Sequence, residues 1–411
     1  MTTRIKSLQV FSGGLPAGEL YKDSQFHFHY APSASDDVAV SLTMPVRRDE
    51  FRRSTLHPVF EMNLPEGYLR QRIIERFRKH ATIDDMFFLA LQGDSSIGRL
   101  GFHSSGLERT GVRGASLESL VTTDNPELFE NLVERYLGQT TIAGVQPKIL
   151  VPENSEPKSA LVLPELIVKA AGPEFPGLTI NEFVCMSIAK RAGLDVPEFY
   201  LSENQQLFIM RRFDIRPDGQ RLGMEDICAL MGLVANDKYQ RSYEQVAKAV
   251  AVYSEQPNRD LEAFFRSLCI SVLVGNGDAH LKNFAMLYEN PASGKSWLSP
   301  AYDIVNTTVY LPADTLALKL SRSKDFPNRT IMTRFGREHC HLTEKQAEAV
   351  IDECIAAVHW GIDQFSGQMV QVECEGRTLL SEMVNGVGRL MNPAQKQSQW
   401  KGEVRLPKRT R

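Results

Sequence analysis

The feature that most constrains how this chain can fold is the octapeptide at 276–283, Asn-Gly-Asp-Ala-His-Leu-Lys-Asn. Apolar residues recur upstream of it at near-helical spacing and stop at Gly275, which predicts a buried helix that ends where the octapeptide begins. These apolar residues are Leu261, Phe264, Phe265, Leu268 and Val272. The octapeptide is therefore predicted to be a loop delivered by a buried helix.

A Tyr-Asp pair at 302–303 follows the octapeptide after two strand-like segments. The segments Phe284–Tyr288 and Trp297–Ala301 flank an Asn-Pro-Ala-Ser-Gly turn, so they predict a hairpin that carries the chain back. We expect this hairpin to bring Asp303 opposite Asn283.

Asp278, Asn283 and Asp303 supply the carboxylate, amide and second carboxylate that transfer of a phosphoryl group from ATP requires. Asp278 and Asn283 are five positions apart, which is the spacing of the base and the metal-binding amide in the catalytic loop of protein kinases. Mg²⁺ prefers oxygen ligands, so we predict that Asn283 and Asp303 hold the metal and that Asp278 accepts the proton of the acceptor hydroxyl. His280 beside Asp278 also suits a metal hydrolase, although no third ligand follows at zinc-type spacing.

A lysine on an upstream strand has a candidate in Lys169, which ends the apolar run Leu166–Val168. Glu182 lies thirteen positions later in the amphipathic run Asn181–Arg191. Their pairing would aim Lys169 at the α and β phosphates of a nucleotide. The alternative is that Lys169 ends a strand at solvent and Glu182 lies on an exposed helix face.

The turn-rich segment Thr141–Lys148 precedes the apolar strand pattern Ile149–Val151, and its backbone N–H groups are suited to cradle phosphate. It contains neither a Walker A sequence nor a GxGxxG motif. The Gly-Lys-Ser at 294–296 is not a P-loop either, because Glu289 stands where the first glycine would be.

Further short motifs recur in a fixed order along the chain. They are Asn63-Leu64-Pro65-Glu66-Gly67, Gly93-Asp94 with Gly98, Ile142–Lys148, Asn181-Glu182-Phe183, Arg212-Phe213-Asp214, Glu225-Asp226, Asp278–Asn283 and Pro300–Asp303. In order and combination they resemble the HipA family of bacterial serine/threonine kinases, the toxins of type II toxin-antitoxin pairs. The resemblance spans most of the chain.

The resemblance implies a role for each matching residue in an ATP- and Mg²⁺-dependent site. It implies that Asp278 is the catalytic base, that Lys169 is the catalytic lysine on the nucleotide phosphates, and that Asn283 and Asp303 are metal ligands. It also implies that Phe213 lines the adenine pocket. The other nucleotide-site positions that it implies are Ala143, Gly144, Val145, Gln146, Lys148, Arg212, His280, Lys282 and Tyr302.

Two positions depart from the family pattern. Family members phosphorylate a serine of their own just before the phosphate loop, and Thr141 with Thr140 beside it stands there in this chain. Threonine still offers a hydroxyl, so autophosphorylation remains a prediction. Arg211 stands where relatives usually carry Glu, so any adenine or ribose contact made there must differ.

The expected fold is α+β and protein-kinase-like, with a mixed upper lobe, a mainly helical lower lobe and a small N-terminal α/β subdomain. The expected divisions are 1–110 for the N-terminal subdomain, 111–215 for the upper lobe, 216–395 for the lower lobe and 396–411 for a basic tail. Strands are predicted at Leu8–Phe11, Phe26–Tyr30 and Val38–Leu42, and helices at Gly67–Lys79, Tyr243–Tyr253, Leu261–Val274, Glu344–Val358 and Leu379–Met391.

Composition narrows the compartment and the partners. The net charge is −3, so the chain as a whole is not an obvious nucleic-acid binder. The six cysteines show no CxxC spacing and indicate reduced thiols, and no leader or membrane-spanning run is recognised, so a cytoplasmic protein is expected. His339-Cys340-His341 suggests a metal cluster, but the capping box Thr343–Gln346 favours a helix entrance.

The resemblance implies a growth-arresting kinase held in check by a small helix-turn-helix antitoxin of the HipB kind, with operator DNA contacted mainly through that antitoxin. It also implies a protein substrate of the translation apparatus, such as an aminoacyl-tRNA synthetase. A small-molecule kinase remains an alternative, as does a catalytically silent, nucleotide-gated scaffold that acts as co-repressor in an antitoxin–operator complex.

Overall fold

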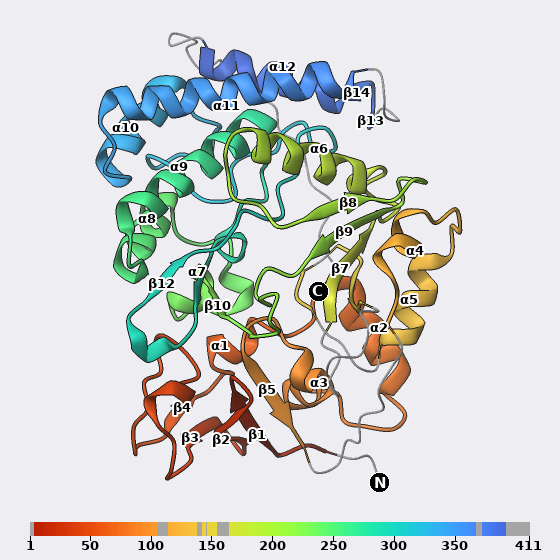
Figure 1. The fold of residues 1–411 in the computed structure, drawn as a ribbon, viewed down its shortest axis with the longest axis vertical. Coiled ribbons are helices and arrows are strands. Elements are labelled where there is room, and N and C mark those ends of the chain that lie inside the picture. The colour runs from red at the N-terminus through yellow and green to blue at the C-terminus, as the bar shows by residue number, and fades with distance from the viewer. Residues whose placement is uncertain are drawn as a thin grey trace.

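The computed structural model describes residues 4–104, 114–137, 142–144, 146–153, 164–366 and 372–391. An N-terminal sheet, a second sheet with a long helix against it, and a mainly helical body follow one another along the chain (Figure 1). The predictions for Thr140, Thr141, Val145 and the tail 396–411 concern positions outside the described residues.

The N-terminal part is a five-stranded antiparallel sheet in the order β4-β3-β2-β1-β5. Its strands are β1 (Ser7–Ser12), β2 (Leu15–Lys22), β3 (Phe26–Tyr30), β4 (Phe51–Arg53) and β5 (Leu100–His103). Its helices are α1 (Pro58–Glu61), α2 (Gly67–Phe77) and α3 (Asp85–Gln92), with the single turn η2 (Gly93–Ser95). Phe60 packs edge-on against Phe28 and Phe102 at 5.4 and 5.9 Å between ring centroids, which joins α1 to the sheet. The strands predicted at 8–11 and 26–30 and the helix predicted from Gly67 are confirmed.

The strand predicted at Val38–Leu42 is wrong, because the chain there forms the single turn η1 (Asp36–Val38) and then an irregular segment. The apolar run is buried, as a strand would be. Its backbone groups, however, bond to side chains: the Val40 N–H donates to the Tyr30 hydroxyl at 3.0 Å, and the Ser12 hydroxyl donates to the Ala39 carbonyl at 3.1 Å. Hydrogen bonds with side-chain hydroxyls thus replace the strand-to-strand backbone hydrogen bonds that the apolar run suggested.

The second sheet is antiparallel, in the order β6-β7-β9-β8. Its strands are β6 (Lys148–Pro152), β7 (Pro164–Ala170), β8 (Phe199–Leu201) and β9 (Leu207–Arg211), and the helices of this region are α4 (Leu117–Val121), α5 (Leu128–Tyr136) and α6 (Leu178–Arg191). Lys148 and Lys169 are direct cross-strand partners, so their side chains leave the same face of the sheet. Helix α6 contacts β7, β8 and β9 and carries Glu182.

The rest of the chain is mainly helical and is built around α9 (Pro257–Val274), against which α8, α11 and α12 pack (Figure 1). The helices are α7 (Ile227–Leu230), α8 (Tyr243–Tyr253), α10 (Arg329–His339), α11 (Glu344–Phe365) and α12 (Leu379–Met391), with the single turns η3 (Ala235–Asp237), η4 (Leu281–Asn283) and η5 (Pro291–Ser293). The strands are β10 (Gly223–Asp226), β11 (Ala285–Tyr288), β12 (Ser296–Leu298), β13 (Glu373–Cys374) and β14 (Arg377–Thr378). All four helices predicted in this part and the hairpin β11–β12 are confirmed, although β12 is shorter than predicted.

Two buried polar clusters fasten the N-terminal sheet to the other parts. The Arg212 guanidinium bonds to Asp214 at 2.9 Å and to the Ser96 carbonyl at 2.8 Å, and Asp214 accepts from the Gly98 N–H at 2.7 Å. The Glu225 carboxylate accepts from the Ser41 hydroxyl, the Leu42 N–H and the Tyr288 hydroxyl at 2.6, 2.7 and 2.8 Å. Charged groups buried with complete sets of partners fix the relative position of the elements that supply them.

The remaining expectations concern cysteines, metal clusters and membrane spans. All six cysteines are free thiols, five of them buried. His339 ends α10, and Thr343 caps α11 with the predicted capping box. Over the described residues no group of His, Cys, Asp or Glu has the makings of a metal cluster, and none of the helices combines the length and apolar character that crossing a bilayer would take.

Candidate active site

Lys169 lies at the centre of a buried ion-pair network on the second sheet. Its side chain is only 2% exposed; its ammonium donates to Glu182 at 2.5 Å and also contacts the Asp303 carboxylate. The Lys148 ammonium lies 4.0 Å from the second carboxylate oxygen of Asp303. The predicted pairing of Lys169 with Glu182 is present, and the alternative in which Lys169 ends a strand at solvent is wrong.

Burial and charge oppose each other in this network. Burial alone would lower the pKa of Lys169, but the Asp303 and Glu182 carboxylates outweigh it and raise the pKa above its ordinary value. Burial raises the pKa of Glu182 to about 7, because the Lys169 ammonium offsets only part of the desolvation. Burial would also raise the pKa of Asp303, yet Lys169 and Lys148 hold it well below the ordinary range. Lys169 therefore stays cationic and Asp303 anionic.

The loop at 276–283 is held in one shape by its own backbone. The Asn276 side-chain oxygen accepts from the Asp278 N–H at 3.0 Å. The carbonyl of Asp278 accepts from the His280 N–H at 2.7 Å, and the His280 carbonyl accepts from the Asn283 N–H at 3.0 Å. Asp278 and Asn283 consequently sit at the two ends of a short hydrogen-bonded turn.

Asp303 meets this loop from the returning hairpin. The Asn283 amide donates to the Asp303 carbonyl at 3.4 Å, and the Tyr302 hydroxyl donates to the Lys282 carbonyl at 2.8 Å. Asp303 adopts φ of 55°, a left-handed conformation that a non-glycine residue takes at a cost. The Phe213 ring lies 5.5 Å from the Tyr302 ring, so the proposed adenine-side residue adjoins the loop. Asp303 thus links Lys169 to Asn283.

The residues fit a triphosphate and a divalent cation by their chemistry. Asn283 and Asp303 bring oxygen donors of the type Mg²⁺ prefers, and Lys148 and Lys169 bring cations from the facing sheet. His280 is buried, and within the described residues its Nδ1 has no hydrogen-bond partner. Burial lowers the pKa of His280 to about 4, so the ring is neutral at physiological pH. Its Nδ1 can therefore still form a hydrogen bond with a ligand.

Of the predicted phosphate loop, the structure describes residues 142–144 and 146–148. Gly144 has φ of 120°, and a Cβ built there would collide with the Lys148 ammonium, so only glycine allows that approach. The Gln146 side chain donates to the Ala170 carbonyl at 3.4 Å, which ties the loop to the end of β7. The loop therefore adjoins Lys148 and Lys169.

Two predicted nucleotide residues point elsewhere. The Arg212 guanidinium is taken up by the buried cluster with Asp214 and Ser96, and the Lys282 ammonium binds Glu66 at 2.5 Å. Lys282 contributes its backbone carbonyl, rather than its charge, to the contact with Tyr302. We therefore regard Arg212 and Lys282 as positioning residues. Arg211, which stands where relatives usually carry Glu, pairs with Glu153 and with Glu198, the latter at 3.1 Å.

Sequence reasoning missed the contacts of Glu66, Lys238 and Tyr239 beside the loop. Glu66, just before α2, accepts from Lys282 and, at 3.1 Å, from Lys238. Tyr239 donates its hydroxyl to the Asp278 carboxylate at 2.7 Å. Glu66 stood within a motif that resembles the family, but nothing in its local sequence indicated a partner more than two hundred positions away.

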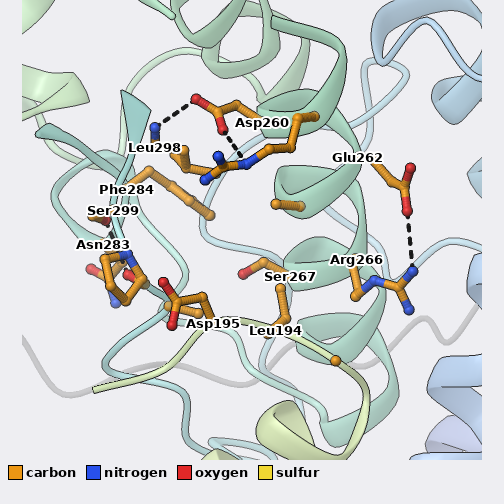
Figure 2. A pocket seen from close by; sticks show the side chains of 15 residues that line it. Leu194, Asp195, Asp260, Glu262, Arg266, Ser267, Asn283, Phe284, Leu298 and Ser299 are labelled. Carbon is orange, nitrogen blue, oxygen red and sulfur yellow. Dashed lines mark hydrogen bonds and ion pairs between the residues drawn. The ribbon is translucent and has the colours of Figure 1, made fainter. Parts of the chain in front are cut away.

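A cavity of about 300 Å³ lies between α9 and the hairpin, with Asn283 on one side and Glu262 and Arg266 on the other (Figure 2). The Asp260 carboxylate faces β12 and accepts from the Leu298 N–H at 2.7 Å. Arg266 bonds to Glu262 at 3.2 Å and to the Ala192 carbonyl at 2.9 Å. The buried Asp260 and the half-buried Arg266 are thus paired with protein groups. Lys148, Lys169, Glu182 and Asp303 are not among the described residues that line this cavity, so it is distinct from the ion-lined site described above.

The fold is that of a two-lobed, kinase-like α+β protein. It is similar to HipA of Shewanella oneidensis MR-1, solved in complex with HipB and its operator DNA, with a TM-score of 0.73 and 20% sequence identity over 93% of this chain and 97% of that one. The predicted fold class is confirmed.

Family models then identify the family. The model of the HipA N-terminal domain matches residues 8–103, and that of the HipA-like C-terminal domain matches residues 140–361, more than half of the chain. The chain belongs to the HipA family, as its motifs predicted.

Relatives agree with this assignment. A Sinorhizobium fredii protein named as kinase Y4dM is 33% identical over 45% of this chain and 49% of its own length. A Haemophilus influenzae protein named as a kinase is 30% identical over 48% of this chain and 62% of its own length. The serine/threonine-protein kinase toxin HipA of Shewanella oneidensis is 24% identical over 75% of this chain and 77% of its own. The chain thus spans about half of the first relative, less than two thirds of the second and more of the third.

Proposed function

We propose that this protein is an ATP- and Mg²⁺-dependent protein serine/threonine kinase that acts as the toxin of a HipA-like toxin-antitoxin pair. The observation that carries the proposal is the contact of the Asp278–Asn283 turn with Asp303, whose carboxylate also meets the Lys169–Glu182 pair. These contacts support assigning the roles of base, metal ligands and phosphate lysine to one set of neighbouring residues.

The chain's own residues account for each requirement of the transfer. Bound ATP with Mg²⁺ supplies the phosphoryl group and shields its charge. Asn283 and Asp303 would hold the metal through oxygen atoms, and Lys169 and Lys148 would bind the phosphates. Asp278 accepts the proton of the acceptor hydroxyl as the hydroxyl oxygen bonds to the γ-phosphorus, and the bond between that phosphorus and the β–γ bridging oxygen breaks to release ADP.

Lys169 has to exchange partners when nucleotide binds. Its ammonium holds both Glu182 and Asp303, although Asp303 is needed by the metal. A divalent cation on Asp303 would weaken the contact with Lys169 and free that ammonium for phosphate, while Glu182 keeps it oriented. The buried Lys169–Glu182 pair therefore corresponds to the pair of a strand lysine and a helix glutamate in protein kinases.

Substrate, self-modification and partners belong to the same proposal. We expect a cytoplasmic protein acceptor in the translation apparatus, such as an aminoacyl-tRNA synthetase, and self-modification at Thr141 or Thr140. A helix-turn-helix antitoxin of the HipB kind is the expected partner, since the fold neighbour from Shewanella oneidensis was solved with HipB and operator DNA. DNA contact is expected mainly through that partner.

The test is transfer of labelled γ-phosphate from ATP to the proteins of a cytosolic extract, followed by identification of the modified sites. The wild-type chain should label serine or threonine in a few proteins, and Asp278→Asn should abolish labelling while keeping nucleotide binding. Asp124→Asn, at an exposed position, is the matched control and should label normally. Label found in metabolites alone would favour a small-molecule kinase, and partner and operator binding without any transfer would favour the scaffold.

A further inference from the structure

A tyrosine that the sequence did not single out is hydrogen-bonded to the proposed base. The Tyr239 hydroxyl donates to the Asp278 carboxylate at 2.7 Å, within the 2.6–3.2 Å range in which a general base receives the proton of its substrate. This hydroxyl occupies one oxygen of the carboxylate that the acceptor hydroxyl must reach.

The backbone that carries this tyrosine is anchored to the catalytic loop. The Lys238 carbonyl accepts from the Leu281 N–H at 3.1 Å, and the Lys238 ammonium is held by Glu66 at 3.1 Å. The turn is closed by the Gln240 N–H, which donates to the Asp237 carbonyl at 2.8 Å. The position of Tyr239 relative to Asp278 is therefore set by hydrogen bonds and an ion pair of the residues on both sides of it.

The ring of Tyr239 is itself exposed to solvent. Tyr239 is 42% exposed, although its edge meets the buried His280 ring at 5.1 Å between centroids. One side of the phenol thus faces solvent, and the hydroxyl end lies on the base. An acceptor that approaches Asp278 from solvent meets this ring first.

We propose that Tyr239 marks the acceptor subsite, its hydroxyl standing in for the serine or threonine hydroxyl of the substrate and having to be displaced before transfer. The inference rests on the proposed kinase function and adds a residue that governs the acceptor rather than the nucleotide. Tyr239 competes with every acceptor, water included, and so restricts idle hydrolysis of ATP.

The experiment compares the full-length wild type with Tyr239→Phe, which keeps the ring and removes the competing hydroxyl. The probe acceptors are water, followed as ATP hydrolysis without added protein, and a synthetic peptide of residues 136–146 of this chain, which contains both threonines. We expect hydrolysis to rise and the KM for the peptide to fall by about tenfold, the factor for losing one hydrogen bond to a charged group, with the KM for ATP unchanged.

Controls separate this inference from the kinase proposal. Tyr200→Phe removes another tyrosine hydroxyl that faces a carboxylate, that of Glu198 at 3.5 Å. It should change neither the rate of ATP hydrolysis nor the KM for the peptide. Active wild type with unchanged hydrolysis and unchanged peptide KM in Tyr239→Phe would overturn the acceptor role alone. Phosphotyrosine at 239 would also overturn it, because the residue would then be a substrate. A wild type without hydrolysis or transfer would remove the kinase proposal and this inference together.

Discussion

At the scale of single residues, the candidate active site consists largely of charged side chains that are buried and paired. Lys169 is almost fully enclosed and shares its ammonium between Glu182 and Asp303. Removing one member of such a network leaves the others without compensation, so its effects should exceed those of a surface ion pair.

Lys169→Ala should raise the KM for ATP and lower kcat/KM by about a hundredfold, because one charged contact to the phosphates is lost. The measurement is the dependence of phosphate transfer on ATP concentration. Lys295→Ala, at an exposed turn lysine, is the matched control and should behave as wild type. An unchanged dependence on ATP in Lys169→Ala would remove this lysine from the proposed nucleotide site.

Residue spacing predicted part of this site and missed the rest for a physical reason. Asp278 and Asn283 lie within one turn, so local sequence determines their separation. Tyr239 and Glu66 reach the same loop only through tertiary packing, over 39 and 216 positions respectively. A single sequence contains no direct signal for contacts of that kind.

At the scale of elements, the junction between α9 and the loop at 276–283 requires a glycine. Gly275 has φ of 73° at the C-terminus of α9, and a Cβ added there would lie 2.6 Å from the Thr308 hydroxyl oxygen. Any other residue at position 275, where α9 ends, would therefore suffer both backbone strain and a collision with Thr308.

Gly275→Ala should lower the free energy of unfolding by about 2–3 kcal/mol, which combines left-handed strain with the displacement of Thr308. Chemical denaturation measures the loss. The control is Gly294→Ala, since Gly294 also has a positive φ of 67° but nothing within 4 Å of an added Cβ. It should cost only about 1 kcal/mol, and equal losses in the two variants would contradict the packing argument.

Elements with a clear period were predictable, and those without one were not. Helices α8 and α12 have the predicted bounds because each presents an apolar stripe. Strand β2 was missed because Pro16, Ala17 and Gly18 break any alternation, and 38–42 was mistaken for a strand because its buried run bonds to hydroxyls instead of a neighbouring strand. Register and pairing, not propensity, decided both cases.

At the scale of the whole molecule, one carboxylate of the N-terminal part, that of Glu66, is paired with Lys282 in the loop at 276–283 of the helical body. Burial would raise the pKa of Glu66, but the ammonium groups of Lys282 and Lys238 outweigh it and lower the pKa to about 2. The N-terminal part is therefore expected to be needed for a properly formed site.

This depressed pKa has a definite consequence for stability. Because the folded pKa lies below the ordinary value, the contribution of Glu66 is fully present above about pH 5 and is lost as pH falls toward 2. Glu66→Gln should lower the free energy of unfolding by about 3 kcal/mol at pH 7. Between pH 5 and 3, the free energy of unfolding of this variant should fall less steeply with pH than that of the wild type. Glu75→Gln, in an exposed pair with Arg72, should alter neither. Denaturation curves at several pH values measure both effects, and parallel pH profiles for Glu66→Gln and wild type would count against the coupling.

The convergence of three oxygen-bearing side chains on one metal-bound nucleotide is the central claim. An experimental structure of the full chain with Mg²⁺ and a non-hydrolysable ATP analogue tests it most directly. We predict a metal ion bound by the side-chain oxygens of Asn283 and Asp303, phosphates on Lys169, and the carboxylate of Asp278 open toward the terminal phosphate. A nucleotide bound elsewhere, or a metal held without Asn283 and Asp303, would contradict the account.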